Sequence, residues 1–229
     1  VLERGGSDPF IVLPDADVEA AAIAATEGRL VNSGQSCIAA KRFIVVEPVA
    51  DRFLERFKSE LASRKMGDPT ARGTQVGPQA RTDLRDQLHQ QVEESVKRGA
   101  RALLGGQVPA GKGAFYPPTL LSAVDRGMPA FDEETFGPVA AVIRAKDEAD
   151  AIRLANDTTF GLGAALWTRD RARAGRLAVQ IEAGAVFVNG VVKSDPRLPF
   201  RGIKPSGYGR ERSEYGLRDL VNIKSVWIA

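Results

Sequence analysis

The sequence predicts an α/β protein built on a mostly parallel sheet flanked by helices. Short runs of β-branched and aromatic residues alternate along the 229-residue chain with segments whose apolar residues recur every three to four positions. Parallel strands need long crossover connections, which helices provide, so this alternation favours a parallel sheet covered by helices. With 43% hydrophobic and 27% charged residues, the composition is that of a globular protein with a substantial core.

The first elements are expected between residues 10 and 62. Residues 10–13 form an apolar run typical of a buried strand, and Asp17 suits the N-cap of a helix over residues 18–30. A second strand is expected over residues 42–47, followed by a helix that Pro48 opens. The apolar face of this helix is made of Val49, Phe53, Phe57 and Leu61.

Strands and helices continue to alternate in the rest of the chain. A long polar helix over residues 80–99 carries an apolar stripe, and a loop rich in Gly and Pro covers residues 199–209. Residues 222–228 are expected to end the chain as a strand that could pair outside its own domain, which indicates a homo-oligomer. The other expected strands are 102–104, 119–124, 139–143, 164–168 and 185–189, and the other helices are 148–155 and 172–179.

Composition also argues against several functions. The formal net charge of +3 is small and basic residues are interleaved with acidic ones, so nucleic-acid binding is not expected. No apolar run is long enough for a membrane span, and the first residues resemble no signal peptide. Cys37 is the only cysteine, which excludes an internal disulfide and favours a reducing cytoplasm. No metal-binding spacing and no dinucleotide-binding glycine motif is present.

Cys37 is the candidate nucleophile. It lies between an expected helix and an expected strand, in a stretch of small residues that lets the backbone turn tightly. Free N–H groups of a short turn, together with Lys41 and Arg42, would favour the thiolate. The alternative is a buried cysteine that packs as a small apolar residue. His89, the only histidine, is expected to face solvent on a polar helix and is a poor candidate for a catalytic base.

Five segments carry distinctive motifs: residues 3–10, 32–37, 131–139, 188–190 and 199–211. Together they resemble the aldehyde dehydrogenase superfamily, and the likeness covers essentially the whole chain. Other details are most similar to the branch that oxidises succinate semialdehyde with NAD or NADP, namely residues 37–46, 84–92 and 116–119.

The resemblance implies roles for six residues. Cys37 would add to the aldehyde carbonyl to give a thiohemiacetal and then a thioester, and Glu3 would activate the water that hydrolyses it. Glu134 and Phe136 would contact the ribose and nicotinamide end of the cofactor. Ser194 and Phe200 match positions that line the aldehyde pocket of this family.

The resemblance also bears on organisation and substrate. Residues 1–213 would form the catalytic domain and residues 214–229 a segment holding the oligomerisation strand, while the amino-terminal coenzyme domain would be absent. We therefore expect the intact parent to use NAD or NADP and this chain alone to bind none and to be inactive as a dehydrogenase. An arginine that can hold the substrate carboxylate in this branch is replaced by Val31, which leaves Arg42 or Arg201 as substitutes.

Two other functions stay open from the residues. Cys37 could cleave activated esters without a cofactor, or the chain could be a non-catalytic assembly fragment.

Overall fold

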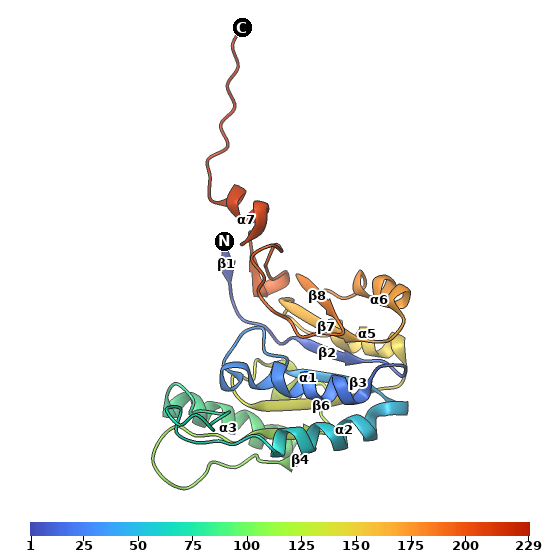
Figure 1. The fold of residues 1–229 in the computed structure, drawn as a ribbon, viewed down its shortest axis with the longest axis vertical. Helices are drawn as coiled ribbons and strands as arrows, with labels where there is room; N and C mark the ends of the chain where they lie inside the picture. The colour runs from blue at the N-terminus through green and yellow to red at the C-terminus, as the bar shows by residue number, and fades with distance from the viewer.

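A seven-stranded sheet with helices on both faces forms the centre of the molecule (Figure 1). The computed structural model describes residues 1–229. The strand order is β4-β5-β6-β3-β2-β7-β8, and every neighbouring pair is parallel except β4 with β5. The predicted α/β fold with a mostly parallel sheet is therefore confirmed. The strands are β2 (Pro9–Val12), β3 (Arg42–Val46), β4 (Arg101–Leu104), β5 (Thr119–Ser122), β6 (Val139–Ala145), β7 (Gly163–Trp167) and β8 (Ala185–Val188).

The helices connect these strands as the sequence pattern predicts. Their bounds differ from the expected ones by a few residues at most. As predicted, the side chain of Asp17 caps the first helix, since it accepts a hydrogen bond from the Ala20 N–H. The long helices are α1 (Val18–Leu30), α2 (Glu47–Ala62), α3 (Thr82–Lys97), α5 (Glu148–Asn156) and α6 (Arg171–Ala178), with a short α4 (Pro129–Asp132). No helix has the length and apolar character needed to cross a bilayer.

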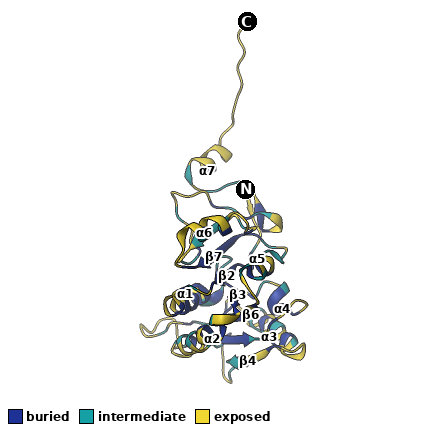
Figure 2. Cartoon of the chain, turned by 90° about the vertical axis from the view of Figure 1, so that its right-hand side faces the viewer, coloured by how far each residue is buried: buried dark blue, intermediate teal, exposed yellow.

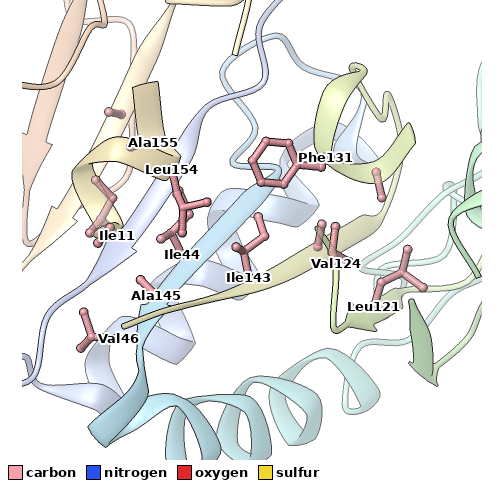
Figure 3. Close-up of a cluster of buried hydrophobic side chains, with 14 of the residues drawn as sticks. Ile11, Ile44, Val46, Leu121, Val124, Phe131, Ile143, Ala145, Leu154 and Ala155 are labelled. Atoms are coloured by element: carbon pink, nitrogen blue, oxygen red, sulfur yellow. The ribbon is translucent and has the colours of Figure 1, made fainter. Parts of the chain in front are cut away.

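Side chains of the central strands alternate between two cores, one on each face of the sheet. Phe10 and Phe43 point to the face covered by α1 and α2, where they pack with Phe57 of α2. Ile11 and Ile44 point to the opposite face, which α3, α4, α5 and α6 cover (Figure 3). Because a strand has a side-chain period of two, both faces of a doubly covered sheet must be apolar, as these strands are.

The apolar stripe of α3 is narrower than expected. Leu88 and Val92 are buried, but Leu84 is half-buried and Val96 is 41% exposed, while Ser95 is buried in its place. A spacing of exactly four drifts around a helix of 3.6 residues per turn, so its outer members leave the core face.

The carboxyl-terminal strand is not found. Residues 222–228 have no regular structure, and the end of the chain extends away from the body of the molecule (Figures 1 and 2). Within one chain no strand lies beside this segment, and Trp227 is 91% exposed. The sequence pattern also missed α7 (Ser213–Asp219), which begins at the expected domain boundary, and the small pair of β1 (Leu2–Glu3) with β9 (Gly207–Tyr208).

Candidate active site

The candidate site lies where three neighbouring strands begin. Residues 3–8 precede β2, residues 31–41 precede β3, and residues 133–138 precede β6. Because β6, β3 and β2 are adjacent and parallel, the loops before them meet at the amino edge of the sheet. This arrangement brings the loops of Glu3, Cys37 and Glu134 together.

Cys37 sits in a tight turn between α1 and β3. The N–H of Ala39 donates to the Ser36 carbonyl over 3.1 Å and closes the turn. The Cys37 side chain is half-buried, which rules out the alternative of a cysteine fully enclosed in the core. The Cys37 N–H donates no hydrogen bond within the chain, so it is free to bind an oxygen near the sulfur.

Strained backbone precedes this turn. Asn32, Ser33 and Gly34 all have positive φ angles, with Gly34 at +78°. The backbone of Gly34 lies so close to Gly137 that a Cβ would come within 2.3 Å of the Gly137 carbonyl, and Arg29 donates to the Gly34 carbonyl over 2.8 Å. Such conformations persist only where the surroundings hold them, and here they join the cysteine loop to the loop before β6.

Lys41 anchors the cysteine turn from inside the protein. Its side chain is 1% exposed, and Nζ donates to the carbonyl oxygens of Ser36, Cys37 and Ala39 over 3.2, 3.0 and 3.0 Å. The same Nζ lies 3.4 Å from Oε1 of Glu134. A single buried ammonium group therefore links the turn that carries Cys37 to Glu134.

Glu134 also holds the loop before β2. Its Oε1 accepts from the Gly6 N–H over 3.1 Å. Its Oε2 lies against Gly5, where a Cβ would come within 2.4 Å of that oxygen at a φ of +88°. The positive φ angle favours glycine at position 5. Oε2 accepts no hydrogen bond within the chain, and the side chain is 23% exposed.

Glu3 lies on β1, which β9 pairs in antiparallel register with Glu3 opposite Gly207. Glu3 is exposed. Partial loss of hydration raises the pKa of its carboxyl above the ordinary value, the charge of Glu211 adds to this effect, and Arg212 opposes it. A raised pKa makes a carboxylate a better base for water.

The electrostatics of Cys37 differ from the sequence prediction. Burial is the largest effect and raises the pKa of the thiol, and the negative charge of Glu3 raises it further. Lys41 and the Ile38 N–H lower it without cancelling these effects. Arg42 does not contribute as predicted, because its side chain is fully buried and donates to the carbonyls of Ser7, Leu154 and Ala155 on the far side of the strand.

Buried charges beneath the site were missed by the sequence analysis. Asp8, Arg29 and Lys41 are all at most 1% exposed, and the Asp8 carboxylate accepts from the Gly163 N–H over 3.0 Å. Burial raises the pKa of Asp8 and lowers that of Lys41. The available signal was the position of Lys41 directly before a strand that is otherwise apolar, where a charged side chain must find partners inside.

The remaining predicted residues are placed as follows. Phe136 is 44% exposed, Ser194 is exposed on the loop after β8, and Phe200 is buried with its backbone bridged to Glu211. The roles of these residues toward cofactor and aldehyde stay predictions. Val31, at the place of the expected arginine, is exposed.

His89 does not face solvent freely, contrary to the prediction. It is half-buried on α3, where Nδ1 lies 3.1 Å from the Tyr116 hydroxyl and Nε2 lies 3.6 Å from Glu93. Its contacts with Tyr116 and Glu93 cover part of the ring. The chain holds no cluster of three or more His, Cys, Asp and Glu residues able to bind a metal ion.

Residues 1–226 match the aldehyde dehydrogenase family, and the chain belongs to that family. Over 227 residues it is 54% identical to the succinate semialdehyde dehydrogenase (NAD(P)+) Sad of Escherichia coli, a match that covers 99% of this chain and 49% of the relative.

Solved structures agree with this assignment. The structure of Gox0499, described for its cofactor and substrate selection, superposes with a TM-score of 0.96 at 45% identity and covers 99% of this chain and 50% of that one. The succinic semialdehyde dehydrogenase of Streptococcus pyogenes, solved with NADP+, gives a TM-score of 0.95 at 36% identity, with 99% and 50% covered. The chain thus spans about half the length of the relatives it matches.

Proposed function

We propose that this chain carries the thiol-bearing half of an NAD(P)-dependent succinate-semialdehyde dehydrogenase, with Cys37 as nucleophile and Glu3 as base. The observation that carries the proposal is the half-buried Cys37 thiol in a tight turn, with a free N–H of its own and with the Glu3 carboxylate near enough to raise its pKa. The substrate class follows the names of the relatives.

The chemistry follows from the groups at this turn. The Cys37 thiolate adds to the aldehyde carbon and forms a C–S bond. The carbonyl oxygen becomes an oxyanion, which accepts a hydrogen bond from the Cys37 N–H. This oxyanion is the deprotonated thiohemiacetal. When bound, NAD(P)+ would supply the acceptor for the hydride of this carbon; as the hydride leaves, the oxyanion re-forms the C=O bond, and a thioester remains on Cys37. Glu3 then takes a proton from water as the water oxygen attacks the thioester, which releases the carboxylic acid and the thiolate.

Two residues fit the nicotinamide end of the cofactor. Oε2 of Glu134 accepts nothing within the chain and can accept a ribose hydroxyl, and the exposed ring of Phe136 offers an apolar contact. We propose that these residues position the cofactor in the whole enzyme, and that residues 1–229 alone do not turn over aldehyde.

The proposed substrate carries a carboxylate that needs a cation, and Arg42 and Arg201 were the two predicted candidates. Arg42 is excluded because its guanidinium is buried among backbone carbonyls. Arg201 is half-buried and uses its Nε on the Gly202 carbonyl, which leaves its terminal nitrogens without protein partners. We propose Arg201, with Ser194, as the carboxylate-binding pair.

A chimera tests the proposal. The half of the Escherichia coli relative that this chain does not match would be joined to the present chain, which replaces the matched half. We expect formation of NADPH or NADH dependent on succinate semialdehyde, and a loss of more than about 10³-fold in Cys37→Ser. Full activity in Cys37→Ser would contradict the role of Cys37, and robust dehydrogenase activity of the isolated chain would contradict the division of roles.

A second candidate is a cofactor-independent esterase, which the free Cys37 N–H favours because it can bind the oxyanion of an ester. Steady hydrolysis of p-nitrophenyl acetate by the isolated chain, unchanged by NADP+ and absent in Cys37→Ser, would support it. A single burst of one equivalent without turnover would instead support the dehydrogenase half-site.

A further inference from the structure

We propose that Lys41 is a positioning residue for Cys37: it holds the carbonyl ends of two peptide units whose N–H ends serve the sulfur and the oxyanion. This inference rests on the proposed role of Cys37. The carbonyls in question belong to Ser36 and Cys37, which Nζ of Lys41 binds over 3.2 and 3.0 Å.

Peptide geometry connects these contacts to the reacting atoms. In a trans peptide unit the C=O and N–H bonds point in opposite directions within one plane. The Ser36 carbonyl shares its unit with the Cys37 N–H, which has no acceptor within the chain. The Cys37 carbonyl shares its unit with the Ile38 N–H, which lowers the pKa of the thiol by hydrogen bonding. A cation bound at both carbonyl ends therefore directs both N–H groups away from itself, toward the thiol side of the turn.

A charged donor does more than orient these peptides. A hydrogen bond from an ammonium group polarises the carbonyl it binds, and polarised peptide units donate more strongly at their N–H ends. Lys41 also acts directly, because its positive charge lowers the pKa of the thiol against the effects of burial and of Glu3. Both effects favour negative charge on the sulfur and on the oxyanion.

The buried surroundings of Lys41 show how its charge is maintained. Oε1 of Glu134 lies 3.4 Å from Nζ, the negative charge of Asp8 also stabilises the ammonium group, and the charge of Arg29 opposes it. The third carbonyl, that of Ala39, lies 3.0 Å away and completes the hydrogen bonds that three N–H donors can make.

The test is the alkylation of Cys37 by iodoacetamide in the isolated chain, followed by intact mass across a range of pH. In Lys41→Met we expect the apparent pKa of the thiol to rise by about one unit and the alkylation rate at pH 7 to fall about tenfold. The amide proton resonances of Cys37 and Ile38 should move upfield in a ¹H–¹⁵N spectrum, because their peptide units lose the cation. Lys58→Met is the matched control, because Lys58 is exposed on α2 and forms no ion pair. It should leave the alkylation rate and the amide resonances unchanged.

A double variant separates the loss of the Lys41 hydrogen bonds from the effect of an unpaired Glu134 carboxylate. Lys41→Met alone leaves the Glu134 carboxylate without its cation, which would itself raise the pKa of Cys37 and destabilise the chain. Lys41→Met/Glu134→Gln removes both charges, and we expect the slow alkylation and the displaced amide resonances to persist. A double variant with the alkylation profile and amide resonances of the unmodified chain would overturn the inference.

These readouts do not need dehydrogenase activity. If the chimera stayed active in Cys37→Ser, the proposed function would fail while the alkylation data still reported on Lys41. If the chimera depended on Cys37 but the double variant behaved like the unmodified chain, only the inference would fail.

Discussion

At the scale of single residues, opposing effects set the pKa of the Cys37 thiol. The sequence predicted that Cys37 would lie in a tight turn between a helix and a strand, and the structure confirms this placement. It also predicted that Lys41 and Arg42 together would lower the pKa of the thiol. Neighbouring side chains in extended backbone point to opposite faces, so only Lys41 reaches the turn. Burial and the charge of Glu3 raise the pKa of the thiol by more than Lys41 lowers it.

Replacement of Glu3 should therefore change two rates in opposite directions. Glu3→Gln removes a negative charge that raises the pKa of Cys37, so the thiolate fraction at pH 7.5 increases and alkylation by iodoacetamide becomes faster, by about two- to tenfold. The same change removes the proposed base, so turnover of the chimera should fall about 10²-fold or more.

Glu55→Gln is the matched control, since Glu55 is exposed on α2 and forms no ion pair. Slower alkylation in Glu3→Gln than in the unmodified chain would contradict the proximity of Glu3 to the sulfur.

At the scale of elements, the site exists because β6, β3 and β2 are neighbours. The sequence indicated each of these strands with nearly correct bounds, since their apolar runs are bounded by polar and turn residues. It did not indicate their order in the sheet, which depends on packing between segments far apart in the chain. The meeting of the loops before these strands, and the salt bridge of Lys41 with Glu134, could therefore not be predicted from the residues alone.

Gly34 tests how tightly these loops are joined. Gly34→Ala places a Cβ 2.3 Å from the Gly137 backbone at a φ of +78°, and backbone atoms on both sides cannot move aside cheaply. We expect the free energy of unfolding, measured by urea denaturation, to fall by at least about 2 kcal/mol. Alkylation of Cys37 should also change, because the turn that follows Gly34 shifts.

Gly73→Ala is the matched control, because a Cβ there meets no atom within 4 Å and the φ angle is not positive. Its stability should stay within about 0.5 kcal/mol of the unmodified chain. Equal stability of Gly34→Ala and Gly73→Ala would show that the loops are not joined as described.

At the scale of the whole molecule, the sheet and its helices form buried cores, whereas the carboxyl-terminal residues are exposed and have no regular structure. The sequence predicted a terminal strand because residues 222–228 have the right composition, yet a strand needs a partner and none lies beside this segment in one chain. Apolar side chains consequently remain in water at the end of the chain: Ile223, Val226, Trp227 and Ile228. Assembly through this segment stays a prediction.

Removal of residues 222–229 tests whether this segment contributes to the stability of one chain and whether it joins two chains. Because the segment buries little against the rest of the chain, the free energy of unfolding at low protein concentration should change by less than about 0.5 kcal/mol. If the segment pairs between copies, sedimentation at high concentration should show a complex for the full chain and none for the shortened one. A large loss of stability in the dilute, shortened chain would contradict the exposed position of this segment.

Alkylation of the native, unmodified chain by iodoacetamide at pH values from 7 to 10 tests directly whether the Cys37 thiol is reachable and ionisable. We predict one adduct, located on Cys37, at a rate that rises with pH through and beyond the ordinary range of a thiol, because burial and Glu3 raise its pKa. A chain that forms no adduct until it is unfolded in urea would contradict the claim that a reachable, ionisable thiol lies at this edge of the sheet.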